Sequence, residues 1–195
     1  MSVSKNRAAI LALIILSGCA HLGLSTISLK SPDVLISTDD VRMINSSIIC
    51  VVPFSSRENI TGPWLGEITR AYVRAIQVRN IGALVRYFDT QRDFLVERKS
   101  CHLVIEGSVD RLLFTGGGQP QEMIVSVQVR DLTTEQVIFS LRQEGIAGPG
   151  RDVDLYWTTV EGQRAAPARK LIDSMSDQFG KLLMDEILKS SRKSV

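Results

Sequence analysis

Hydrophobic residues in the second half of the chain alternate with polar ones, which is typical of strands with one buried face. The clearest run places apolar side chains at Met123, Val125, Val127 and Val129. Val137, Phe139 and Leu141 repeat the pattern, and a third apolar segment runs from Leu103 through Val109 to Phe114. Turn-forming residues separate the three segments, at 115–120 and 131–135. We therefore expect an antiparallel meander of three strands.

Two other segments follow the helical period. Gly62-Pro63 opens the first, because proline is favoured in the first turn of a helix, and its apolar stripe is Leu65, Ile68, Tyr72 and Ile76. The second follows Pro167 and carries a longer stripe: Ala168, Leu171, Ile172, Met175, Phe179, Leu182, Leu183 and Ile187. Each stripe predicts a helix that buries one face.

The remaining apolar runs do not alternate. Residues 48–54 form a continuous run rich in β-branched side chains, as expected of a strand buried on both faces. Residues 83–88 predict a second strand, and the charged segment 90–98 predicts one or two helical turns. The order predicts an α+β fold: a mixed sheet, built from strand-helix-strand and then the meander, packed by two main helices.

The N-terminus has the layout of a secretory signal peptide. Lys5 and Arg7 precede an apolar run of nine residues, Ala8 to Leu16. A membrane span needs about 20 residues, so this run predicts a cleaved signal rather than an anchor.

The segment Leu16-Ser17-Gly18-Cys19 resembles the lipobox of bacterial lipoproteins. The resemblance implies cleavage before Cys19, followed by attachment of diacylglycerol and an N-acyl chain to that cysteine. Ala20 stands where an aspartate would favour retention in the inner membrane. The resemblance therefore implies a lipid anchor in the outer membrane, with the protein on its periplasmic face.

These features divide the chain into four segments. Residues 1–18 are the predicted signal peptide, and residues 19–46 the lipidated cysteine and a tether. Residues 47–190 form the predicted periplasmic domain, and residues 191–195 a tail.

Charge and composition argue against several classes of function. Without Lys5 and Arg7, the 23 basic residues fall to 21 and equal the 21 acidic residues. A neutral chain without basic blocks is a poor candidate for binding nucleic acid. Only two His and three Cys are present, and the Gly116-Gly117-Gly118 run leads into a strand rather than a helix. We therefore expect no metal site, no cofactor and no catalytic site.

Cys50 and Cys101 remain once Cys19 is lipidated, in a compartment that permits disulfides. Each lies at the start of a predicted strand, so the two could face each other if those strands are parallel neighbours. Buried core thiols are the alternative.

Three aromatic residues lie in or beside predicted loops: Trp64, Tyr156 and Trp157. Trp and Tyr are favoured at protein interfaces and at membrane surfaces. With Arg151 nearby, they are candidates for contact with a neighbouring subunit or the membrane. Alternatively, they cap the ends of the core.

The ordered elements resemble the periplasmic lipoprotein superfamily that includes the curli-export lipoprotein CsgG, the Pel exopolysaccharide lipoprotein PelC, the penicillin-binding-protein activator LpoB and the N-terminal domain of TolB. The likeness covers residues 47–190 and rests on Val52-Pro53-Phe54, Val85 to Phe88, His102 to Val109, and Val125 to Ser140. The small size is similar to the Pel-type member, for which the resemblance implies a ring of subunits that assists polysaccharide export. Two departures from the curli-type members argue against pore formation: several arginines follow Trp64-Leu65-Gly66-Glu67 in the first helix, and the sequence shows no long amphipathic hairpins.

We therefore expect a non-enzymatic outer-membrane lipoprotein, an assembly or export accessory working with an envelope protein complex, with a homo-oligomer as one form it could take. The alternative is a monomeric periplasmic module that regulates a cell-wall enzyme or a transporter.

Overall fold

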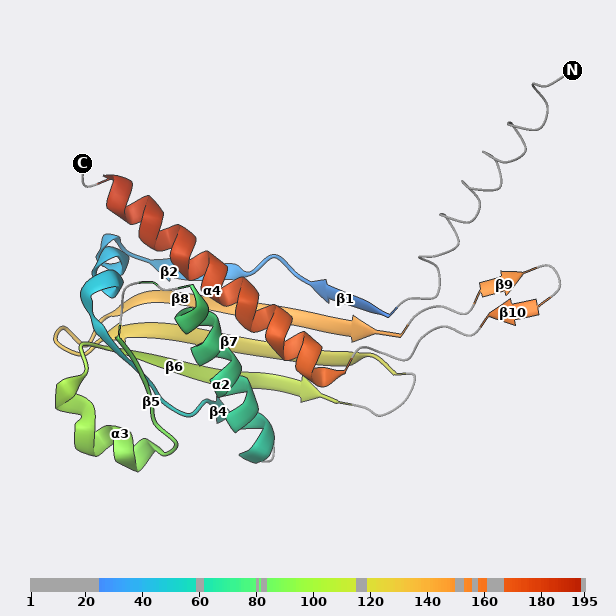
Figure 1. The fold of residues 1–195 in the computed structure, drawn as a ribbon, viewed down its shortest axis with the longest axis horizontal. Coiled ribbons are helices and arrows are strands. Elements are labelled where there is room, and N and C mark those ends of the chain that lie inside the picture. Colours follow the sequence, from blue (N-terminus) through green and yellow to red (C-terminus); the bar gives the residue numbers. More distant parts are fainter. Residues whose placement is uncertain are drawn as a thin grey trace, which may run out of the picture.

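Eight strands form one mixed sheet in the computed structural model, which describes residues 25–58, 62–79, 81, 84–114, 119–149, 153–155, 158–160 and 167–193 (Figure 1). These strands are β1 (Thr26–Leu29), β2 (Asp33–Ser37), β3 (Ile48–Val51), β4 (Ser55–Ser56), β5 (Leu84–Tyr87), β6 (Leu103–Leu113), β7 (Gln121–Asp131) and β8 (Val137–Gly148). Their order is β1-β8-β7-β6-β3-β5, while β2 also pairs with β8 and β4 with β6. A separate hairpin consists of β9 (Val153–Leu155) and β10 (Thr158–Val160).

The helices are α2 (Gly62–Val78), α3 (Gln91–Glu97) and α4 (Ala168–Lys193), with 3-10 turns η1 (Asp39–Ser46) and η2 (Arg98–Ser100). The strands of the meander are antiparallel, whereas β6, β3 and β5 run parallel. The α+β fold predicted from the sequence is therefore confirmed.

One face of the sheet lies under α2 and α4 (Figure 1). The alternating apolar residues of β7, from Met123 to Val129, are almost fully buried on this face. It also buries Gln143, whose Oε1 accepts a hydrogen bond of 2.8 Å from the Tyr72 hydroxyl. Gly145 allows α4 to approach β8, because a Cβ there would crowd Leu171 and Met175.

The other face carries a smaller core beside α3. Phe88 and Phe94 pack edge-to-face in it, with ring centroids 5.8 Å apart. Thr90 is the N-cap residue of α3, directly before Gln91. Its Oγ1 accepts a hydrogen bond of 3.1 Å from the Asp93 N–H and so caps the first turn.

A disulfide joins Cys50 and Cys101 in this smaller core, with Cα atoms 5.8 Å apart. Cys50 lies in β3, and Cys101 directly precedes β6, its parallel neighbour.

Three segment boundaries differ from those the sequence predicts. The tether predicted for residues 19–46 is shorter, because β1 and β2 pair with β8 and η1 buries Val41 and Ile44. Strand β8 continues to Gly148, beyond Leu141, the last alternating apolar position in the sequence, and the β9–β10 hairpin follows before Pro167. Helix α4 continues to Lys193, into the tail predicted for residues 191–195.

Candidate membrane-facing end

The N-terminal segment enters the domain at one end of the main sheet. Strand β1 begins with Thr26, which pairs with Gly148, the last residue of β8. Only residues 20–25 separate this strand from Cys19. Cys19 and the predicted signal peptide lie outside the described residues.

The ends of the long strands lie beside this entry point. Leu113 of β6 pairs with Glu122, Glu122 with Ile146, and Ile146 with Ser28 of β1, so one row of residues crosses four strands here. Helix α4 begins at the same end (Figure 1). The entry of the chain, the β6–β7 turn and the start of α4 are thereby brought together.

Trp64 lies in the first turn of α2 and is half-buried. Its ring packs edge-on against Phe114, which follows β6, with ring centroids 4.7 Å apart. Both side chains pack on the main core. Trp64 therefore caps the core and leaves part of its ring exposed.

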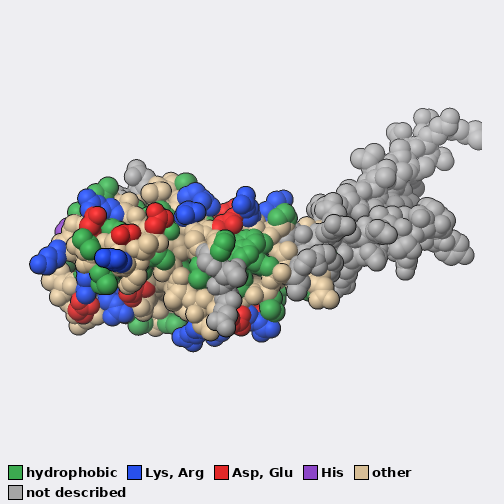
Figure 2. All heavy atoms as spheres, turned by 90° about the horizontal axis from the view of Figure 1, so that it is seen from below, with side chains coloured by type: hydrophobic (Ala, Val, Ile, Leu, Met, Phe, Trp, Pro, Cys, Tyr) green, Lys and Arg blue, Asp and Glu red, His purple; other side chains and the backbone are tan. Residues whose placement is uncertain are grey.

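Figure 2, seen from below, shows hydrophobic side chains gathered in a patch near the middle of the view, with charged side chains of both signs around it.

The β9–β10 hairpin extends beyond this end of the sheet (Figure 1). Leu155 pairs with Thr158, so the two residues that connect the strands are Tyr156 and Trp157. Tyr156, Trp157 and Arg151 lie outside the described residues.

A cavity of about 600 Å³ lies over β6, β7 and β8 on the face opposite α2 and α4, beside the start of α3. Small polar side chains line its floor: Ser108, Ser126, Gln128 and Ser140. Val52, Pro53, Ser55, Arg57 and Gln91 line its rim. Polar and apolar groups both line this cavity, whereas the face under α2 and α4 packs an apolar core.

The carboxylates at this cavity already hold partners. Glu106 Oε2 accepts a hydrogen bond of 2.7 Å from Gln128 Nε2 and lies 3.3 Å from Arg130 Nη2. Asp110 accepts from the Ser126 hydroxyl at 2.6 Å and lies 3.4 Å from Arg57 Nε. These hydrogen bonds connect Glu106 and Asp110 to the Gln128 and Ser126 side chains that line the cavity.

The cysteine and histidine next to the start of β6 both have structural partners. Cys101 is held in the disulfide, and the His102 Nδ1 accepts the Ile48 N–H at 3.1 Å, a structural role at the start of β6. No three His, Cys, Asp or Glu side chains of the described part of the chain gather as a metal site would need. Within the same residues, no helix has the length and apolar composition to cross a membrane.

No protein-family model matches the chain, and no curated protein matches it. Among solved structures, the PelC dodecamer from Paraburkholderia phytofirmans is similar over 82% of this chain and 96% of that one, with 15% identity and a TM-score of 0.52. A single-residue variant of that PelC matches over 81% and 98%, with 13% identity and a TM-score of 0.51. Lipoprotein GNA1162 from Neisseria meningitidis, at 9% identity, covers 71% of this chain and 99% of that one at a TM-score of 0.43, too low to establish a common fold.

These identities are too low to carry function from one protein to another. The two PelC comparisons extend over nearly the whole described domain. The chain therefore shares the fold of PelC.

Proposed function

We propose that the chain is an outer-membrane lipoprotein, anchored through Cys19, whose periplasmic domain assembles with copies of itself. It serves as a non-enzymatic accessory of an envelope machinery for export or assembly. The observation that carries the proposal is the entry of the chain beside the end of β8.

The short connection places this end of the domain near the membrane. Residues 20–25 span at most about 20 Å when fully extended. An acylated Cys19 would therefore hold the end carrying the β9–β10 hairpin close to the bilayer. Trp157 and Tyr156 connect the strands of this hairpin and are suited to the lipid–water interface, because each combines an apolar ring with a polar group.

Two observations support an assembly role. The similar PelC forms a dodecamer, and the predicted mature chain carries equal numbers of basic and acidic residues, so identical subunits would have little net repulsion. The satisfied hydrogen bonds around Glu106 and Asp110 support a structural accessory rather than a catalyst.

Replacement of Cys19 tests the anchor. Cys19→Ser in the full chain should remove fatty-acid labelling and release the protein from the membrane fraction, because the other cysteines are joined in a disulfide. Ser17→Ala, next to the cleavage site, is a matched control that should keep the label. A Cys19→Ser protein still labelled by fatty acid would refute the lipobox interpretation.

The hairpin is tested on vesicles of phosphatidylethanolamine and phosphatidylglycerol. In the Cys19→Ser background, Trp157→Ala should weaken binding to these vesicles with little change in thermal stability. Arg151→Ala should weaken it further, because an arginine would favour the anionic lipid. Trp64→Ala is the control, which should lower thermal stability because Trp64 packs on Phe114. Unchanged vesicle binding by the Trp157 variant would remove the hairpin from the proposed contact.

The mass of the full chain in mild detergent tests assembly. Light scattering should give several times the mass of one mature chain. That mass is the 21.6 kDa of the whole sequence minus the mass of the signal peptide. A monomer at high concentration would instead support the regulatory module, for which the 600 Å³ cavity offers a binding surface.

A further inference from the structure

One border of the main sheet is formed by β1 and β2, which both pair with β8, and the other by β5. None of the three has an outer partner among the described residues. Strand β2 pairs only with β8, and β5 pairs only with β3. The register places Ser37 of β2 and Tyr87 of β5 on one row, which crosses the sheet through Phe139, Val129, Ile105 and Val51. The two free edges therefore lie at the same height on opposite sides of the domain.

Strand β2 exposes three consecutive apolar residues, Val34, Leu35 and Ile36. Leu35 lies at a bulge, has no Cα partner in β8 and is 63% exposed. Natural edge strands are usually shielded by charged residues, proline or bulges. Here Pro32 and Asp33 lie at the start of β2 and a bulge at Leu35, but the three apolar residues between Asp33 and Ser37 remain exposed. An edge of this kind is suited to contact with another protein surface.

The opposite side also exposes apolar residues. Leu84, the first residue of β5, is 56% exposed, and Leu95 and Val96 are exposed on α3. Helix α3 packs beside β5, because Arg86 of β5 reaches Glu97 at 3.5 Å. We call these two surfaces the β2 edge (residues 33–40) and the β5 edge (residues 84–100).

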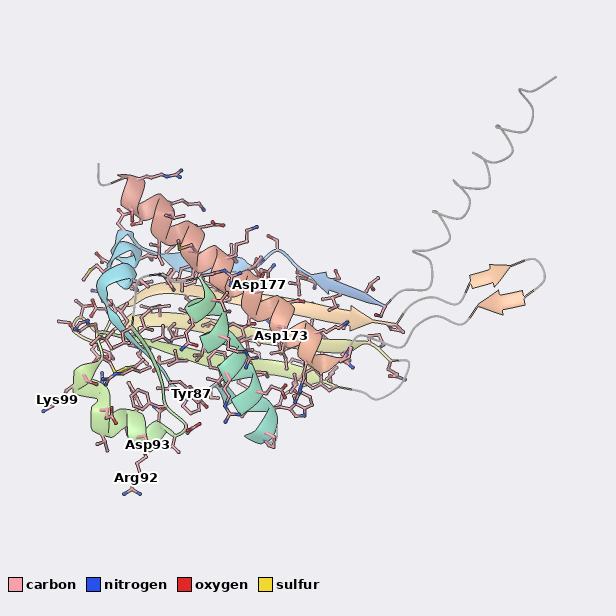
Figure 3. The ribbon with its side chains drawn as sticks, viewed as in Figure 1. Tyr87, Arg92, Asp93, Lys99, Asp173 and Asp177 are labelled. Carbon is pink, nitrogen blue, oxygen red and sulfur yellow. A yellow bond between two sulfur atoms is a disulfide. The ribbon has the colours of Figure 1, made fainter. Side chains whose placement is uncertain are left out.

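The two edges carry complementary charge. Residues 33–40 include three aspartates and no basic residue, and Asp33 and Asp40 have no ion pair among the described residues. On the β5 edge, Arg92 and Lys99 are exposed and likewise unpaired within the described chain, and both project away from the sheet (Figure 3). The β5 edge as a whole carries four basic and three acidic residues, for a net charge of +1, against −3 on the β2 edge. Net charges of opposite sign favour contact between one copy and the next.

The strand directions allow the lipid anchors of all copies in a ring to lie on the same side, facing the membrane. Strand β2 is antiparallel to β8, whereas β5 runs in the same direction as β8 through β3 and β6. In a ring whose axis is normal to the membrane, β2 of one copy would therefore meet β5 of the next in antiparallel orientation, and every Thr26 would face the membrane. Antiparallel pairing of two β2 edges would instead turn one of the two anchors away from the membrane.

We infer that the β2 edge of one copy binds the β5 edge of the next, a head-to-tail contact that closes into a ring. The inference rests on the proposed assembly of the chain and names the surface that would carry it.

Matched Leu→Lys variants of the full chain in detergent test this contact. Leu35→Lys and Leu84→Lys should each weaken association by at least about tenfold, because each places a charge in a desolvated contact. Leu113→Lys is the control, since Leu113 is an exposed leucine, at 39%, that lies on a central strand away from both edges. All three variants should unfold at nearly the wild-type temperature.

A mixing experiment distinguishes head-to-tail contact from the alternatives. A Leu35→Lys chain retains an intact β5 edge, and a Leu84→Lys chain retains an intact β2 edge. An equimolar mixture should therefore form dimers of one copy of each, although either variant alone is monomeric. Assembly of Leu84→Lys at the wild-type level would overturn the inference in favour of β2–β2 pairing.

Charge reversal gives a second, independent readout. Asp33→Lys with Asp40→Lys should weaken assembly about tenfold at low salt, and adding Arg92→Glu with Lys99→Glu should restore it. If the wild type assembles and neither set of variants alters its mass, the edge contact is refuted while assembly stands. A monomeric wild type would refute both assembly and the contact.

Discussion

The two faces of the main sheet are stabilised by different interactions. Under α2 and α4, the sheet packs a continuous apolar core, and its buried polar side chain Gln143 is satisfied by Tyr72, by Gln178 and by the Met175 carbonyl. The opposite face has only the small core around the disulfide, beyond which lies a half-exposed network around Glu106 and Asp110.

The two faces should therefore respond differently to substitution. Substitutions under the helices change packing, so they act on stability first. Substitutions in the open network act on groups that water can solvate, so they leave the fold intact. The open face and the sheet edges are therefore the surfaces on which binding can vary without loss of the fold.

Loss of the Cys50–Cys101 disulfide should have the largest effect on the free energy of unfolding. Cys50→Ala with Cys101→Ala should lower the free energy of unfolding by about 4 kcal/mol, because the bond closes a loop across a sequence separation of 51. Urea unfolding of the variant and the wild type measures the loss, and wild type with reductant is the control. Equal urea midpoints would show that the open face does not depend on this bond.

Replacement of Gly107 tests how tightly the face of the sheet under α2 and α4, the covered face, is packed. A Cβ at this position would overlap the ring of Phe54, which is buried against Tyr72 with ring centroids 5.1 Å apart. Gly107→Ala should therefore lower the free energy of unfolding by about 2 kcal/mol.

Gly66→Ala is the matched control for this effect. Beyond the backbone of its own helix and its chain neighbours, nothing lies within 4 Å of the position that its Cβ would take, and alanine is the better helix former by roughly 1 kcal/mol. This variant should be slightly more stable than the wild type in the same urea experiment. Similar losses in both variants would mean that the covered face is not tightly packed at Gly107.

The sequence predicts the parts of the fold whose periodicity is local. Strand β7 and helix α4 lie where their apolar positions predict them, and residues such as Val125 and Phe179 are fully buried. A two-residue or 3.6-residue repeat determines the buried face without reference to the rest of the chain.

The missed elements depend on distant partners. Strand β2 is exposed along its whole length and pairs with β8, about one hundred residues away, while its Ser37 hydroxyl donates to Glu186 of α4 at 2.8 Å. The second half of β8 buries Gln143, Gly145 and Ala147, which resemble loop residues in the sequence. Gln143 is buried because Tyr72 satisfies it, and Gly145 because α4 approaches closely.

The sequence identifies individual residues of the candidate membrane-facing end but does not predict their arrangement in space. Cys19, Trp64, Tyr156 and Trp157 could be identified by residue type, but nothing local places them together. The pairing of Thr26 with Gly148 brings the entry of the chain to the end from which the hairpin extends. That pairing involves no recognisable motif.

Tyr72 gives an intermediate effect on the covered face. Tyr72→Phe should cost about 1–2 kcal/mol, because the buried Gln143 Oε1 loses its donor. Tyr87→Phe, on a half-buried ring of β5, is the control and should cost much less.

Alkaline pH gives a second measure of Tyr72. Burial raises the pKa of its hydroxyl above the usual value of 10.0, so the ionised form is favoured in the unfolded chain. The resulting contribution to stability is complete below pH 10 and is lost as the pH rises further. Tyr72→Phe should flatten this decline in urea midpoint, and an unchanged slope would contradict the buried environment.

The smallest effect is expected in the open network. The Glu106 and Arg130 side chains are about one-third exposed, at 33% and 30%, and lie 3.3 Å apart. Glu106→Gln and Arg130→Gln should each cost less than about 1 kcal/mol, with a coupling energy of roughly 0.5 kcal/mol in a double-mutant cycle. That coupling should vanish in 1 M salt, where the screening length is about 3 Å. A loss as large as that of Tyr72→Phe, persisting in high salt, would mean that the open face is as essential to the fold as the face under the helices.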